Sequence, residues 1–224
     1  MDGNIHKLVA NFHGLLVADQ NHRYKSWEHC YSYFITDDAD SNIDISSLHL
    51  SFYLASWGMY RGSSFLLWKD YRIHADVVKK LLQNKDLQKL DFSSTGDGEL
   101  KRIIDLSEWI KGWYKDNIKT VNGESKTINV TDTLVTKIML GTLGCIPAYD
   151  RYFIDGMRKS GLSYSKLNKS NLQSVVEYYK KHQMEFDGVQ KDIYEKGNIH
   201  YPAMKLVDMY FWERGFQADK LNIT

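Results

Sequence analysis

Apolar and aromatic side chains recur at three- and four-residue intervals along most of this chain. This spacing places them on one face of an α-helix, which has about 3.6 residues per turn, so it predicts amphipathic helices. The chain has only two prolines, so little in it would break such helices. We therefore predict an all-α fold, a compact multi-helix domain.

The expected elements follow this spacing and the turn signals between them. Helices are expected over 4–35 with a break at 18–24, and over 47–68, 73–85, 100–117, 132–141, 148–159, 171–196 and 202–218. The Asp-rich segment 36–44 is expected to be a loop, after which Ser46 or Ser47 caps the next helix. Residues 118–130 are compatible with one short β-hairpin, because Asn122-Gly123 favours a tight hairpin turn.

The helix expected at 47–68 carries a stripe of small residues, namely Ser51, Ala55, Gly58 and Gly62. A glycine inside a helix costs about 1 kcal/mol relative to alanine, so two of them need a compensating contact. We predict that the backbone of another helix packs closely against this stripe. The alternative is a backbone surface left open for a ligand.

The length of 224 residues, with 43% hydrophobic and 13% aromatic residues, allows one sizeable core. We expect a single helical domain over 1–224. A division into an N-terminal helical half, 1–90, and a C-terminal helical half, 98–224, is the alternative.

Charge and cysteine content indicate the compartment. The net charge is +1, so no field of the whole molecule would attract nucleic acid or an anionic membrane. Cys30 and Cys145 form no CxxC pair, which favours a reduced cytoplasmic setting. The N-terminus lacks the basic start and apolar run of a signal peptide, and Arg61 interrupts the most apolar window, 48–68. We therefore expect a cytoplasmic protein with no membrane partner.

Several familiar motifs are missing from the chain. Neither a GxGxxG nor a GxxxxGK[ST] loop occurs, and there is no GxSxG or HExxH. The two histidine pairs near the N-terminus are each spaced seven residues apart, about 10.5 Å along a helix, which is too far for one zinc ion. We expect neither a metal nor a cofactor.

The segment 134–170 is basic, with six cationic and two anionic side chains for a charge of +4, which leaves −3 for the rest of the chain. Aromatic residues lie between these charges. Such a segment can neutralise phosphates and stack bases. The alternative is a solvated helix face with its aromatic residues in the core.

Within this segment, Gly144-Cys-Ile-Pro147-Ala-Tyr-Asp150-Arg-Tyr-Phe153 follows a helix that is expected to end at Gly141 or Gly144. Pro147 suits the first turn of the next helix, whose free N–H groups favour a phosphate. Residues 135–158 resemble the region around the catalytic aspartate of the helix-hairpin-helix DNA glycosylases. The resemblance implies that Asp150 acts on the N-glycosidic bond of a flipped base.

The match departs from the family in three respects. The loop from Pro147 to Asp150 is short, INVTDTL stands where a Gly-hydrophobic-Gly hairpin is usual, and no lysine matches the nucleophile of the lyase-competent members; Lys137 lies too close to Asp150. The resemblance thus implies a water-using, single-function enzyme. The alternative is that Asp150 only caps its helix.

The resemblance also implies a DNA-binding surface. Basic side chains would hold the DNA backbone, and an aromatic ring, Tyr149 or Trp57, would face the flipped base. The expected nucleic-acid-binding residues are Arg151, Arg158, Lys159, Lys166, Gly144 and Tyr149.

Two other functions fit the sequence. The first is a non-enzymatic helical interaction protein, for example a component of a bacterial defence or toxin–antitoxin system, acting as a homodimer. The second is a ribonuclease of the HEPN type, since Arg23 and His29 resemble its Arg-x(4–6)-His motif. That activity would require the two side chains to face one another across a dimer cleft.

Overall fold

The computed structural model of the chain describes residues 4–197 and 199–221. These residues form eleven α-helices, three short 3-10 helices and one two-stranded sheet, which confirms the all-α prediction. The α-helices are α1 Ile5–Ala18, α2 Lys25–Phe34, α3 Asp38–Ser41, α4 Ile43–Ser56, α5 Ala75–Leu82, α6 Asp97–Asn117, α7 Asp132–Thr142, α8 Arg151–Lys159, α9 Lys169–Lys181, α10 Gln183–Gly197 and α11 Ala203–Leu221. The 3-10 helices are η1 Phe65–Trp68, η2 Tyr71–His74 and η3 Lys85–Lys89.

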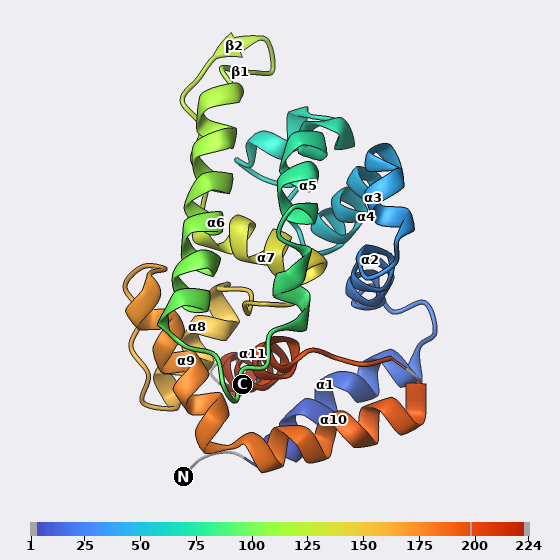
Figure 1. Cartoon of the computed structure of the whole chain (residues 1–224), viewed down its shortest axis with the longest axis vertical. Helices are drawn as coiled ribbons and strands as arrows, with labels where there is room; N and C mark the ends of the chain where they lie inside the picture. The colour runs from blue at the N-terminus through green and yellow to red at the C-terminus, as the bar shows by residue number, and fades with distance from the viewer. Residues whose placement is uncertain (1–3, 198, 222–224) are drawn as a thin grey trace.

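Helix α11 is the element around which the C-terminal and N-terminal parts meet. It packs against α8 and also against α1, while α10 runs beside α1 at the bottom of Figure 1. Helix α2 contacts both α4 and α7. The helices of the N-terminal part therefore pack extensively against those of the C-terminal part. No helix in the part of the chain described here is both long and apolar enough to cross a bilayer.

The expected hairpin is present and projects from the end of α6 (Figure 1). Strands β1 Thr120–Val121 and β2 Glu124–Ser125 pair antiparallel, with Thr120 opposite Ser125. The two turn residues have positive φ, 52° at Asn122 and 80° at Gly123. Positive φ at both central positions is what a type I′ hairpin turn needs, so this prediction is confirmed.

The start of α4 differs from the prediction. The segment expected as a loop contains α3, and Asn42 caps α4 by accepting a hydrogen bond from the Ile45 amide at 3.1 Å. Ser46 and Ser47 are not caps. Both are buried within the helix, where Ser46 donates to the Ala39 carbonyl at 2.8 Å. The helix begins earlier because an asparagine provides the cap that we had assigned to a serine.

The end of α4 contradicts the predicted stripe of small residues. The helix ends at Ser56, and Gly58 and Gly62 follow it with φ of 76° and 61°. Glycine adopts positive φ at no steric cost, which ends a helix. Ser51 accepts a hydrogen bond from the Tyr60 hydroxyl. No continuous stripe of small residues therefore exists on this helix.

Close approach of two helix backbones does occur, but between α8 and α11. A Cβ atom at Gly156 of α8 would lie 1.9 Å from the Phe211 carbonyl oxygen. A Cβ atom at Gly215 of α11 would lie 2.0 Å from the Tyr152 carbonyl oxygen. Both contacts are with backbone, which no rotamer change can relieve. Two glycines therefore set the spacing between these helices.

The long helix expected at 171–196 is two helices. His182 ends α9, its amide donating to the Tyr178 and Tyr179 carbonyls, and its own carbonyl accepts the first hydrogen bonds of α10. Its imidazole Nδ1 lies 2.8 Å from the Glu185 carboxylate. One residue therefore terminates one helix and starts the next, which apolar spacing alone does not reveal.

A buried hydrogen-bond network joins η2 to α4 and α6. The His74 side chain is fully buried, with Nε2 2.8 Å from the Tyr60 hydroxyl and Nδ1 hydrogen-bonded to the Tyr114 hydroxyl. The Tyr60 hydroxyl donates its proton to Ser51. Nε2 of His74 therefore donates to Tyr60, and Nδ1 accepts from Tyr114, as in a neutral imidazole. Burial lowers the pKa of His74 to about 3.

This network makes stability depend on pH. In the unfolded chain His74 has a pKa of about 6.5, so below that pH the unfolded state binds a proton that the folded state does not. The His74 contribution is complete above pH 6.5 and is lost as pH falls. Between pH 7.5 and 5 we expect the loss of this contribution to lower the free energy of unfolding by about 2 kcal/mol. Denaturant titrations of the wild type and of His74→Gln measure this; equal pH slopes for the two would contradict it.

Candidate active site around Asp150

Asp150 lies at the N-cap of α8. One carboxylate oxygen accepts a hydrogen bond from the Phe153 amide at 3.1 Å, and the other lies 2.9 Å from Nζ of Lys137. The Lys137 side chain is 3% exposed and the Asp150 side chain 17%. Asp150 is therefore neither fully buried nor bound only to its own helix. It is a fixed carboxylate with part of its surface open to solvent.

The connection between α7 and α8 fixes this position. Helix α7 ends at Thr142, and Gly144, two residues further on, has a φ of 63° and donates to the Met139 carbonyl. The following segment, 145–149, is irregular and buried. Its backbone is hydrogen-bonded at both ends of Tyr149: the amide donates to Thr136 Oγ1 at 2.9 Å, and the carbonyl accepts from Thr133 Oγ1 at 2.8 Å. Helix α7 thus holds the residue just before Asp150.

Pro147 does not lie in the first turn of α8, as we had expected from the sequence. It is buried in the irregular segment 145–149, and α8 begins at Arg151, after the Asp150 cap. The Ala148 amide next to Pro147 donates to Asp208 of α11 at 3.0 Å. A side-chain cap and a bond to α11 therefore set the helix start.

A second ion pair lies in the same region. Nζ of Lys205 is 2.9 Å from the carboxylate of Asp208, and both side chains are at most 5% exposed. Lys205 and Lys137 each contact the ring of Trp57, with Nζ 5.6 Å and 4.6 Å from its centroid. Two buried cations thus share one indole, which favours cation–π attraction. Each has its own carboxylate, so the charges are compensated.

Aromatic rings surround these ion pairs. Trp57 stacks on Tyr24, with centroids 4.5 Å apart, and Tyr24 meets Trp212 edge to face. Lys205 also lies over the rings of Phe12 and Trp27. We call these five rings, Phe12, Tyr24, Trp27, Trp57 and Trp212, the aromatic cage. Trp57 is half-buried, so the cage has one partly open side.

The electrostatics of Tyr24 connect the cage to Asp150. Burial raises the pKa of Tyr24, the Arg23 guanidinium lowers it, and the negative charges of Asp150 and Glu213 raise it further. Arg23 itself is exposed, lies 4.9 Å from the Tyr24 ring centroid and donates to the Ser56 carbonyl. An arginine therefore covers the outer side of the cage.

The basic residues expected to bind DNA are on the surface. Arg151 is 66% exposed and lies 2.8 Å from Asp219, and Arg158 is 58% exposed and lies 3.4 Å from Asp155. Lys159 and Lys166 are exposed as well. Arg151 adjoins Asp150, whereas Arg158 lies eight residues further along α8, on the order of 12 Å away. The structure thus brings only Arg151 next to the carboxylate.

Gly144 and Tyr149 lie in the interior. A Cβ atom at Gly144 would be 2.6 Å from Pro202 and 2.9 Å from Tyr31. The Tyr149 ring is fully buried against Phe153, and its hydroxyl has no hydrogen-bond partner among the described residues. Neither residue presents a side chain to the solvent in this conformation. Tyr149 and Trp57 were the two aromatic residues considered for contact with the flipped base. Of these, Trp57 contacts Lys137, the ion-pair partner of Asp150.

The charged partners of the site were not identified from the sequence. Lys137 was set aside as too close to Asp150 for a nucleophile, yet it forms the ion pair with that residue. Lys205 and Asp208 are three residues apart on α11 and gave no signal beyond an ordinary helical pair. Their burial was detectable only as two charges within the otherwise apolar stretch 203–212 at the start of α11.

Comparison of the chain with protein-family models, with curated proteins and with solved structures gave no match.

Proposed function

We propose that the chain is a DNA-acting, glycosylase-like enzyme in which Asp150 acts on the N-glycosidic bond of a flipped base. The observation that carries this proposal is the Asp150 carboxylate, fixed by the Phe153 amide and by Lys137 at the open side of the aromatic cage. When a glycosidic bond breaks, positive charge develops on the sugar. A preorganised carboxylate beside that charge stabilises the transition state.

Asp150 could either stabilise the positive charge on the sugar or take a proton from water, and its hydrogen bonds favour the first role. Each of its oxygens already accepts a hydrogen bond from a neighbouring donor. Such a carboxylate is better suited to stabilise the charge on the sugar than to take a proton from water. The sugar would lie over Asp150, and the base would lie against the exposed part of Trp57. Arg151 and Arg23 would contact the adjacent phosphates, and Arg158 would contact a phosphate further along the DNA backbone.

Two measurements test this function. Duplexes carrying uracil, hypoxanthine or an alkylated purine are incubated with excess protein, and the free base is quantified by mass spectrometry. We expect release of at least one of these bases above the protein-free rate. Binding to the same duplexes is measured from low to physiological salt, where Arg158→Ala should reduce the slope of log K on log salt by about 1.

Lys79→Ala is the matched control for Arg158→Ala. Lys79 forms the same kind of i, i+3 pair, with Asp76, and is 57% exposed, but it lies on α5. Lys79→Ala should leave the slope of log K on log salt unchanged. No base release from any duplex, together with a salt slope near zero, would contradict the proposal and favour the interaction protein.

A further inference from the structure

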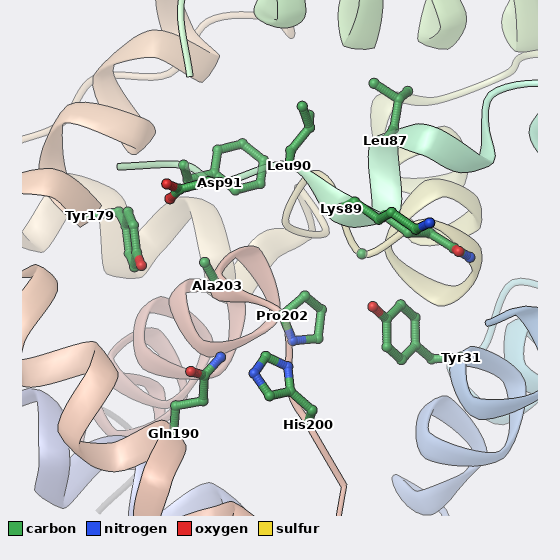
Figure 2. Close-up of a pocket in the computed structure, with 13 residues that line it drawn as sticks. Tyr31, Leu87, Lys89, Leu90, Asp91, Tyr179, Gln190, His200, Pro202 and Ala203 are labelled. Carbon is green, nitrogen blue, oxygen red and sulfur yellow. The ribbon is translucent and has the colours of Figure 1, made fainter. Parts of the chain in front are cut away.

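A cavity of about 290 Å³ lies beside Gly144. Its walls come from η3 and the residues after it, from α2, from α9 and α10, and from the start of α11 (Figure 2). Asp150 is not among its lining residues. The volume is at the lower end of the range for small-molecule sites, roughly 300–1,000 Å³. It suits a ligand of about ten non-hydrogen atoms.

Tyr31 supplies a polar group without a partner. The residue is only 6% exposed, and its ring stacks on Trp27 with centroids 5.0 Å apart. No described residue forms a hydrogen bond with its hydroxyl, which Figure 2 shows turned toward Lys89 and Pro202. Burial, with a smaller effect of Cys145, raises the pKa of Tyr31 to about 12, so the hydroxyl keeps its proton. It is a fixed donor aimed into the cavity.

A cation and further hydrogen-bond donors line the cavity near Tyr31. Lys89 and His200 are exposed lining residues, and no described side chain forms an ion pair with either. Ala203, also in the wall, is the first residue of α11. The N-terminus of a helix of 19 residues carries a positive partial charge and free N–H groups. Lys89, His200 and the start of α11 therefore offer donors that match an anion.

The opposite end has the opposite character. Asp91 lies beside Tyr179, away from Tyr31 (Figure 2). Hydrogen bonds from Ser93 lower the pKa of Asp91, so it is a carboxylate at neutral pH. Its charge would repel an anion there. Phe92 and Pro202 contribute apolar wall to the cavity. A ligand would thus lie with its anionic group toward Tyr31.

We propose that this cavity binds a small organic anion, a carboxylate or phosphate group on a flat apolar body. The anionic group lies between the Tyr31 hydroxyl, Lys89 and the start of α11, and the body lies along Phe92 and Pro202. The site is separate from the one proposed around Asp150 and does not depend on it.

Calorimetry with three anions tests the proposal: benzoate, phenyl phosphate and inorganic phosphate, with benzyl alcohol as the neutral control. We expect saturable binding of benzoate or phenyl phosphate with a dissociation constant on the order of 1 mM, which is typical of ligands of this size. Benzyl alcohol should bind at least about tenfold more weakly, since it forms no charge-assisted hydrogen bond. The tighter of the two aromatic anions identifies the group as carboxylate or phosphate.

Two conservative variants locate the site. Tyr31→Phe keeps the ring on Trp27 and removes only the hydroxyl, and Lys89→Gln removes an exposed charge. Each should weaken binding about tenfold, because each removes a hydrogen bond to a charged group. Lys101→Gln, on the exposed side of α6, should bind as the wild type does. Wild-type binding by both Tyr31→Phe and Lys89→Gln, or no binding of either aromatic anion to the folded wild type, would overturn the proposal.

Discussion

Replacing Asp150 with asparagine is expected to slow base release by at least about 100-fold. Removal of one preorganised electrostatic group from an active site typically costs about 100- to 1,000-fold in rate. Asparagine still accepts a hydrogen bond from the Phe153 amide, so α8 keeps its cap. DNA affinity should change little, because the phosphates contact other residues. Single-turnover release, measured beside binding, separates the two effects.

The variant has a side effect that needs its own control. Asp150→Asn leaves Lys137, whose side chain is 3% exposed, without a counter-charge. Breaking a buried ion pair costs about 3–5 kcal/mol, and the lower figure applies here because Asp150 is partly exposed. The double variant Lys137→Met with Asp150→Asn removes both charges and should recover most of the stability but none of the activity. Base release restored in the double variant would show that Asp150 acts only through the fold.

The position of Asp150 was predictable from the sequence because its determinants are local. The carboxylate caps a helix after a short connection that begins at Gly144, and both features lie within ten residues. Its ion-pair partner was not predictable in the same way. Lys137 reaches Asp150 because α7 packs against the segment 145–149, and spacing in the sequence does not specify such packing. Lys205 and Asp208 come from more than fifty residues further on, so only the tertiary fold brings them to the cage.

In the fold, too, the features set by short segments were predictable from the sequence, and those set by tertiary packing were not. Apolar spacing predicted the helices around 5–34 and 97–117, and Asn122-Gly123 predicted the hairpin, since these are properties of short segments. Gly58 was misinterpreted because a glycine inside a helix and one just beyond its end look alike in a periodic pattern. Its positive φ decides the question, and this is visible only in the structure. Gly156 and Gly215 allow α8 and α11 to approach closely, but no stripe of small residues in the sequence indicated them.

Gly156→Ala is therefore expected to be one of the most damaging single-methyl changes in the chain. The added Cβ atom would lie 1.9 Å from the Phe211 carbonyl oxygen, so α8 and α11 must separate. Overpacking costs about 1–3 kcal/mol, and we expect at least the upper figure because the obstacle is backbone. For a chain of this length, that corresponds to a decrease in Tm of roughly 6–12 °C. Thermal unfolding followed by circular dichroism measures it.

Gly112→Ala provides the matched control, because nothing lies within 4 Å of a Cβ atom at that position in α6. Without a clash, the higher helix propensity of alanine should stabilise the protein by up to about 1 kcal/mol.

The effect of Gly156→Ala should extend to the candidate site. Asp150 caps the first turn of α8, and Lys137 is anchored on α7, so moving α8 away from α11 changes the distance between them. Gly156→Ala should therefore lose base release even at temperatures where it remains folded, whereas Gly112→Ala should retain it. Equal Tm values for the two variants would mean that α8 and α11 do not approach as closely as Gly156 and Gly215 allow.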